Sequence, residues 1–156
     1  MKSIFSALFI ALLCSTHAMA QEASMPKVFL MGENEAGYEK LTQDYAQSLL
    51  EVCGNDMEAA FENWLGMMRE MEGYAKKIKF DLKGVKLWMQ VFWAPDGKID
   101  HIGYLLRSDS RNVNTAELSA FFSSFINRYK LPKTSDKKFA HYTGATFPTF
   151  VEKVSE

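Results

Sequence analysis

The hydrophobic pattern of this chain changes from a helical to a strand-like period close to Lys77, and this change constrains the fold more than any other feature. Before Lys77, apolar residues recur every three or four positions, which is the spacing of an amphipathic helix. After Lys77, apolar and polar residues alternate, as they do in a half-buried strand. The sequence therefore predicts an α+β fold in which an α-rich part precedes a β-rich part.

Two helices are predicted before the change of period. The first spans about 38–52 and ends at Gly54, and the second begins at once, with Asn55 and Glu58 as a capping box. Because the connection is so short, we expect an antiparallel helical hairpin over about 36–76. The second helix carries a dense apolar stripe, formed by Met57, Ala60, Phe61, Trp64, Leu65, Met68 and Met71.

Strands dominate the rest of the chain. A short strand is expected over 78–82, and a longer one over 85–93, followed by the turn sequence Ala-Pro-Asp-Gly and a return strand over 98–107. A helix that begins at Asn114 and ends before Pro132 then leads to a last strand over 139–150. The elements from the long strand onward follow a β-β-α-β order, and we expect them to form a small antiparallel sheet on which the helical hairpin packs.

The first twenty residues have the pattern of a secretory signal peptide. Lys2 precedes an apolar run over 4–13, and Ala18 and Ala20 form an A-x-A cleavage site before Gln21. The apolar run, of about ten residues, is too short to span a bilayer, which takes roughly twenty. The prediction is a chain exported to the periplasm or secreted, without a stable membrane anchor, whose mature part, 21–156, is one domain. Lipidation of Cys14 is an alternative, although Leu13 stands where a lipobox has a small residue.

The net charge argues against one class of partner, and the cysteine content argues against a disulfide. Loss of Lys2 with the leader takes the formal charge from −1 to −2, a balance that does not favour a nucleic acid partner. Cys53 is the single cysteine of the mature chain, so no intramolecular disulfide is expected. The domain must therefore be held together by its hydrophobic core.

Residues 85–150 resemble the C-terminal domain of TonB-type energy transducers. The matching pieces are KLWMQVFWAPDGKIDHIGYLLRSDS, NTAELSAFFSSFINRYKLP and KKFAHYTGATFPTF, in the order strand, D-G turn, strand, helix and closing strand. TonB itself has a membrane anchor and a proline-rich span, and here a helical hairpin precedes the sheet instead. The resemblance implies a last strand at a sheet edge that pairs with an extended peptide of an envelope protein, with a link to outer-membrane transport.

This resemblance places the partner-binding residues on the last strand. Unpaired backbone groups along a sheet edge are what an extended peptide recognises. The partner-binding residues are expected to be Phe139, His141, Tyr142, Thr143 and Gly144.

Candidate catalytic groups do not form a pattern in the sequence. Cys53 has no base and orienting group assigned to it, and the serines lack the G-x-S-x-G and S-x-x-K motifs. His101 and His141 lie on two strands, but two histidines without a third ligand make a poor metal site, and Asp100 is expected on the face opposite His101. We therefore expect no enzyme activity, no cofactor and no metal. The sequence does not indicate an oligomeric state.

Two aromatic residues suggest a different class of function. Trp88 and Phe92 lie on the face of the long strand opposite Leu87, Met89 and Val91, and need cover from the helical hairpin or from a ligand. Cover by the hairpin is the preferred interpretation, and the alternative is a carrier with a hydrophobic-ligand pocket between hairpin and sheet. A third group, Met67, Met68 and Met71, is expected in the core, with a partner-binding groove as its alternative.

Overall fold

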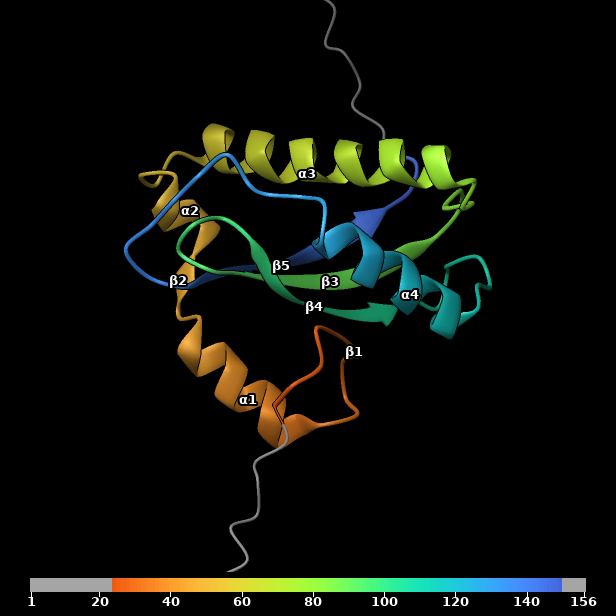
Figure 1. Cartoon of the computed structure of the whole chain (residues 1–156), viewed down its shortest axis with the longest axis horizontal. Coiled ribbons are helices and arrows are strands. Elements are labelled where there is room, and N and C mark those ends of the chain that lie inside the picture. The colour runs from red at the N-terminus through yellow and green to blue at the C-terminus, as the bar shows by residue number, and fades with distance from the viewer. Residues whose placement is uncertain (1–23, 150–156) are drawn as a thin grey trace, which may run out of the picture.

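The structure is a computed structural model that describes residues 24–149, so the predicted signal peptide and Phe150 lie outside the described residues. It is an α+β fold, with four helices and a five-stranded mixed sheet between them (Figure 1). The elements are β1 (Val28–Leu30), α1 (Glu35–Asp44), β2 (Gln47–Ser48), α2 (Leu49–Val52), α3 (Met57–Ile78), β3 (Lys86–Trp93), β4 (Ile99–Leu106), α4 (Thr115–Ile126) and β5 (Phe139–Thr146).

The sheet has the strand order β1-β4-β3-β5-β2. The central strand β3 pairs with β4 and β5 along its length, and both pairs are antiparallel as predicted. The two outer strands are short and parallel to their neighbours, β1 to β4 and β2 to β5. The sheet is therefore mixed, because two N-terminal segments join the antiparallel centre at opposite borders.

The predicted helical hairpin is wrong, because α1 and α3 lie on opposite sides of the sheet (Figure 1). The chain crosses the sheet border between them, through β2 and the four-residue helix α2. Ser48 starts α2 with a capping box to Glu51, which satisfies the amide groups of a new helix start. Leu41 packs on one side of the sheet and Leu49 on the other, although their spacing fits a single helix.

The strand predicted over 78–82 is also not formed. Helix α3 begins after its cap Asp56, not Asn55, and continues to Ile78, where Lys79 adopts a left-handed conformation with φ 58°. Phe80 then stacks on Phe121 of α4, with ring centroids 4.8 Å apart. Phe80 and Leu82 therefore pack with the core between α3 and α4, whereas Ile78, at the end of α3, is 45% exposed.

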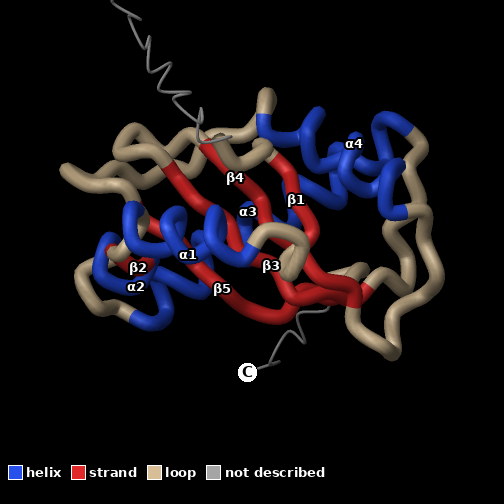
Figure 2. The backbone as a smooth tube through the Cα atoms, turned by 90° about the horizontal axis from the view of Figure 1, so that it is seen from below, coloured by secondary structure: helices blue, strands red, loops and turns tan. Residues whose placement is uncertain are grey.

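Each face of the sheet has its own hydrophobic core. We call the face that α3 and α4 cover the α3–α4 face. Its side chains on β3 are Leu87, Met89, Val91 and Trp93, and they pack in one core with side chains of the neighbouring strands. The α1 face is the opposite one, where Phe92 and Ala140 pack with Phe29 of β1 and with Leu41 and Tyr45 near α1. Figure 2 views the α1 face and shows α1 crossing only part of it.

Candidate functional site

The outer border of β5 is covered at one end only. Strand β2 pairs with Phe139 and Ala140 through Gln47 and Ser48. From 141 to 146, β5 has no strand partner on that side within the described part of the chain, 24–149. Figure 2 shows this stretch following the border of the sheet beyond β2. We call residues 141–146 of β5 the open border.

The hydrogen bonds to β3 show which backbone groups of the open border point outward. Phe147 N donates to Val85 O at 2.9 Å, so the N–H of Phe147 faces β3. Residues of an antiparallel pair alternate between groups that bond the partner and groups that face away. The N–H and C=O groups of Tyr142, Gly144 and Thr146 therefore point away from β3. The backbone groups of Ala140, which lies beside β2, point the same way.

Next to the open border, the α1 face carries exposed apolar side chains. Trp88, Leu105 and Tyr142 are 40%, 47% and 52% exposed, and they lie on the adjacent strands β3, β4 and β5. The rings of Trp88 and Tyr142 stack with centroids 5.9 Å apart, and the Arg107 guanidinium lies 5.6 Å from the centroid of the Trp88 ring. We call Trp88, Leu105 and Tyr142 the aromatic patch.

The other half of the α1 face is closed. Phe92 is fully buried, with the ring of Tyr45 in edge contact at 5.3 Å and that of Phe29 at 6.3 Å. Tyr38 of α1 donates a hydrogen bond to Gln90, so the part of β3 that α1 covers extends from Phe92 to Gln90. Of the two predicted ligand-binding aromatics, Phe92 is thus covered by protein, whereas Trp88 remains accessible.

The predicted partner-binding residues divide between the two faces. Phe139 is fully buried and stacks on Trp93, and His141 packs on Trp64 of α3 with ring centroids 4.9 Å apart. Burial lowers the pKa of His141 below its usual value. Thr143 pairs with Met89. Tyr142 and Gly144 lie on the α1 face, beside the aromatic patch.

The two strand histidines do not meet. His101 on β4 and His141 on β5 are separated by β3 and lie on opposite faces. The placement of Asp100 predicted from simple alternation is wrong. A β-bulge leaves Asp100 out of the β3 pairing, and its carboxylate accepts a hydrogen bond from Tyr45, on the same face as His101. Desolvation and this bond raise the pKa of Tyr45.

The remaining candidates have packing roles. Met67, Met68 and Met71 are almost completely buried in the core beneath α3, as their preferred interpretation predicted. Cys53 is half-buried, and its sulfur accepts a weak hydrogen bond from the amide of Asn63 at 3.9 Å. Burial raises the pKa of the Cys53 thiol, which disfavours the nucleophilic thiolate.

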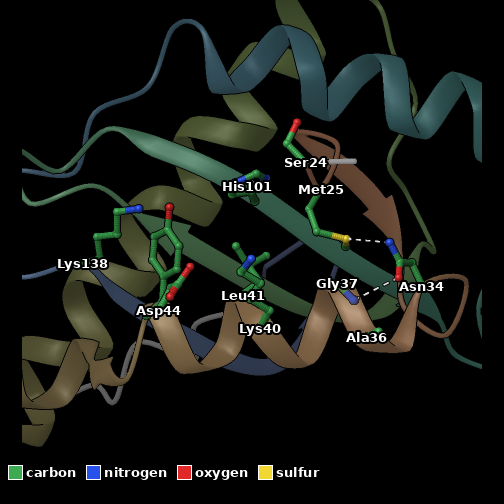
Figure 3. A pocket seen from close by; sticks show the side chains of 11 residues that line it. Ser24, Met25, Asn34, Ala36, Gly37, Lys40, Leu41, Asp44, His101 and Lys138 are labelled. Atoms are coloured by element: carbon green, nitrogen blue, oxygen red, sulfur yellow. Dashed lines mark hydrogen bonds between the residues drawn. The ribbon is translucent and has the colours of Figure 1, made fainter. Parts of the chain in front are cut away.

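A pocket of about 540 Å³ lies between α1 and the sheet, beside the covered half of the α1 face (Figure 3). Sequence reasoning did not identify it, because its side chains come from four separated segments and share no motif. In the sequence, Tyr45 fits the apolar spacing of a helix, and Lys40 and Lys138 resemble any solvated lysine. The lining residues are Ser24, Met25, Asn34, Ala36, Gly37, Lys40, Leu41, Asp44, Tyr45, His101 and Lys138.

Within residues 24–149, no helix is long and apolar enough to cross a membrane, and no cluster of three or more His, Cys, Asp or Glu side chains is placed to hold a metal ion. Comparison of the chain with protein-family models, curated proteins and solved structures finds no match. The geometry of the open border, the aromatic patch and the pocket is therefore the basis for any functional assignment.

Proposed function

We propose that this protein is a non-enzymatic binding domain that captures an extended protein or peptide segment as an added strand along the open border of β5. The observation that carries the proposal is the missing strand partner over 141–146 within the described residues. Added strands of this kind bind mainly through backbone hydrogen bonds. The groups offered to such a segment are the outward N–H and C=O groups of Tyr142, Gly144 and Thr146.

The aromatic patch gives this border a means of selecting side chains. Side chains of a strand alternate between faces, so every second residue of the added segment lies on the α1 face. There it meets Tyr142, which is stacked on Trp88, and Gly144, whose missing side chain leaves the edge of the Trp88 ring accessible. Segments with aromatic or β-branched residues at alternate positions are therefore the preferred ligands.

The cellular setting of the proposal rests on the leader and on the TonB resemblance. An exported chain meets envelope proteins, and the resemblance implies that its partner is an extended segment of one of them, in connection with outer-membrane transport. The proposed recognition needs no cofactor or metal, since backbone pairing and aromatic contact supply the interaction.

The test begins with selection of peptides by the mature protein, residues 21–156, from a random library displayed on phage. An enriched peptide is then titrated while backbone amide hydrogen exchange is followed by NMR. We expect binding to slow exchange at the amides of Tyr142, Gly144 and Thr146, because the added strand accepts hydrogen bonds from them.

Position 144 offers a matched pair of variants. Gly144→Pro removes one outward N–H, which an edge strand tolerates, and we expect it to weaken peptide binding at least tenfold, a loss of about 1.4 kcal/mol. Gly144→Ala keeps the N–H but adds a Cβ 3.4 Å from Trp88, so it should bind more tightly than Gly144→Pro and lose affinity only for peptides that place a large side chain beside Trp88. Circular dichroism confirms that both variants fold. Equal binding by the proline variant, or peptides that protect amides elsewhere, would refute the mechanism.

A carrier for a small hydrophobic ligand is the second candidate function, and the exposure of Trp88 is the observation that favours it. Because Phe92 is covered, such a ligand would lie on Trp88 and Tyr142. Titration with apolar probes then shifts the emission of Trp88, and replacement of Trp88 by phenylalanine removes that shift. Unchanged emission across the panel counts against this alternative.

A further inference from the structure

The open border of β5 lacks the features by which edge strands avoid pairing with other chains. Edge strands commonly carry charged residues, proline or bulges that disfavour an added strand. Residues 139–146 contain no Lys, Arg, Asp, Glu or Pro, and over this length β5 pairs with β3 without a bulge. No charge on β5 therefore opposes its pairing with an identical strand.

The backbone groups of the open border select one register for such a pair. The outward N–H and C=O groups belong to Tyr142, Gly144 and Thr146, while β2 covers Ala140. A two-fold axis beside Gly144 places this residue opposite its own copy and places Tyr142 opposite Thr146. In an antiparallel ladder each of the resulting pairs exchanges two hydrogen bonds. A symmetric register centred on a neighbouring residue leaves one outward position unpaired or opposite β2.

Both ends of the border are compatible with this register. At one end β2 lies beside Phe139 and Ala140. At the other end the chain leaves the line of the strand, because Thr149 N donates a hydrogen bond to Glu72 of α3. In the symmetric pair, the segment after Thr146 of one copy reaches the level of β2 of the other, and its turn toward α3 keeps the two apart.

The aromatic patch supplies side-chain contacts in the same register. On the α1 face, three atoms of the Trp88 ring lie 3.4, 3.7 and 4.0 Å from the place of a Gly144 Cβ, so the ring lies over this glycine. At the axis the two glycines are neighbours, and the two Trp88 rings approach each other above them. Tyr142, which is 52% exposed, meets Thr146 of the second copy. The pair thus covers part of the patch that a single copy leaves exposed.

We propose that a second copy of this chain occupies the open border, as an antiparallel β5–β5 pair centred on Gly144, while no other segment is bound. The inference rests on the proposed function, because the same backbone groups serve both partners. It adds regulation of the border, since capture of a segment requires the two copies to separate. Pairing over 142–146 is small for an interface, so the dimer depends on protein concentration.

Sedimentation equilibrium of the mature protein tests for the pair. Between about 5 µM and about 500 µM, the mean mass is expected to rise from that of a monomer toward that of a dimer. Amide exchange at Tyr142, Gly144 and Thr146 should slow over the same range, because these N–H groups become hydrogen-bonded. A monomer throughout, or a dimer that protects amides elsewhere, would overturn the inference.

Position 144 faces itself across the axis, which allows a charge-swap test of the register. Gly144→Glu and Gly144→Lys each place like charges opposite each other, so each alone should stay monomeric, whereas an equimolar mixture should dimerise. Ala120→Glu and Ala120→Lys are the matched controls, because Ala120 is exposed on α4, which packs on β1 and β4. Both controls should dimerise as the wild type does. No gain on mixing, or an equal loss in the controls, contradicts the proposed pair.

Peptides enriched by phage display distinguish this inference from the proposed function. They should convert the dimer to monomers that each carry one peptide. A chain that stays monomeric and still binds these peptides refutes the dimer and leaves the proposed function intact. A dimer from which no enriched peptide emerges refutes the proposed function, and with it the regulation assigned to the pair.

Discussion

The two faces of the sheet are covered very differently. On the α3–α4 face, Leu87, Met89 and Val91 are fully buried under helices of 22 and 12 residues. On the α1 face the single helix has 10 residues, about 15 Å, and β3 beneath it has eight, about 26 Å. One end of that face is therefore closed over Phe92, while the other leaves Trp88 exposed.

This difference separates the residues that hold the fold from those available to a ligand. Burial on the α3–α4 face contributes most of the hydrophobic stabilisation, since the effect is roughly proportional to apolar area removed from water. The α1 face contributes less and keeps its aromatic patch, the open border beside it and the pocket beneath α1 accessible. Variants on the two faces should accordingly separate stability from binding.

The largest expected effect compares one large residue from each face. Phe122→Ala, in the α3–α4 core, should lower the free energy of unfolding by about 3–5 kcal/mol, because it removes a fully buried ring and leaves a cavity. Trp88→Ala should cost less, about 2 kcal/mol, since 40% of Trp88 is already exposed and the alanine loses only its partial burial and its stacking on Tyr142. Urea unfolding followed by circular dichroism measures both.

The same two variants are informative in the binding assay. Trp88→Ala should weaken capture of selected peptides although it costs less stability than Phe122→Ala. If it cost as much stability as Phe122→Ala, the aromatic patch would be part of the core, and the division between the faces would fail.

Elements fixed by local signals could be predicted from the sequence. The alternation over 85–93 with its Asp-Gly turn predicted the β3–β4 hairpin, and Asn114 predicted the start of α4, where its side chain accepts from Ala116 and Glu117. The apolar stripe of α3 predicted its buried side only in part, because Met57 and Phe61 are 70% and 58% exposed while the other five predicted residues are buried. Each of these signals lies within one element, so no knowledge of the rest of the fold was needed.

What could not be predicted depends on where the chain crosses the sheet. Leu41 and Leu49 keep helical spacing across the break at β2, so the pattern does not reveal that they face different cores. The parallel pairing of β1 involves only three residues. The bulge that turns Asp100 toward Tyr45 and the placement of Lys138 in the pocket both result from tertiary packing, which single-residue patterns do not encode.

An intermediate effect is expected from two glycines that face the same side of the sheet. At Gly103, an added Cβ would lie 2.7 Å from the ring of Phe29, so Gly103→Ala should lower the free energy of unfolding by about 1–3 kcal/mol. At Gly144, the nearest atom to an added Cβ belongs to Trp88, at 3.4 Å, and Gly144→Ala should change stability by less than about 0.5 kcal/mol. Chemical unfolding of both variants checks this pair, and similar losses would mean that the open end of the α1 face is packed as tightly as the covered one.

The smallest effect concerns His141, which is half-buried on the α3–α4 face. Burial against Trp64 lowers the pKa of His141 in the folded protein, while the unfolded chain keeps a value near 6.5. The unfolded state therefore binds more protons below pH 6.5, so the stability that His141 contributes is present above that pH and is lost as the pH falls through the folded-state pKa. Relative to His141→Gln, the wild type should lose stability on acidification, with a slope no steeper than about 1.4 kcal/mol per pH unit. Urea titrations from pH 7.5 to 5 measure this difference, and parallel curves for the two proteins would show that His141 is solvated in the folded state and that the α3–α4 cover ends before the open border.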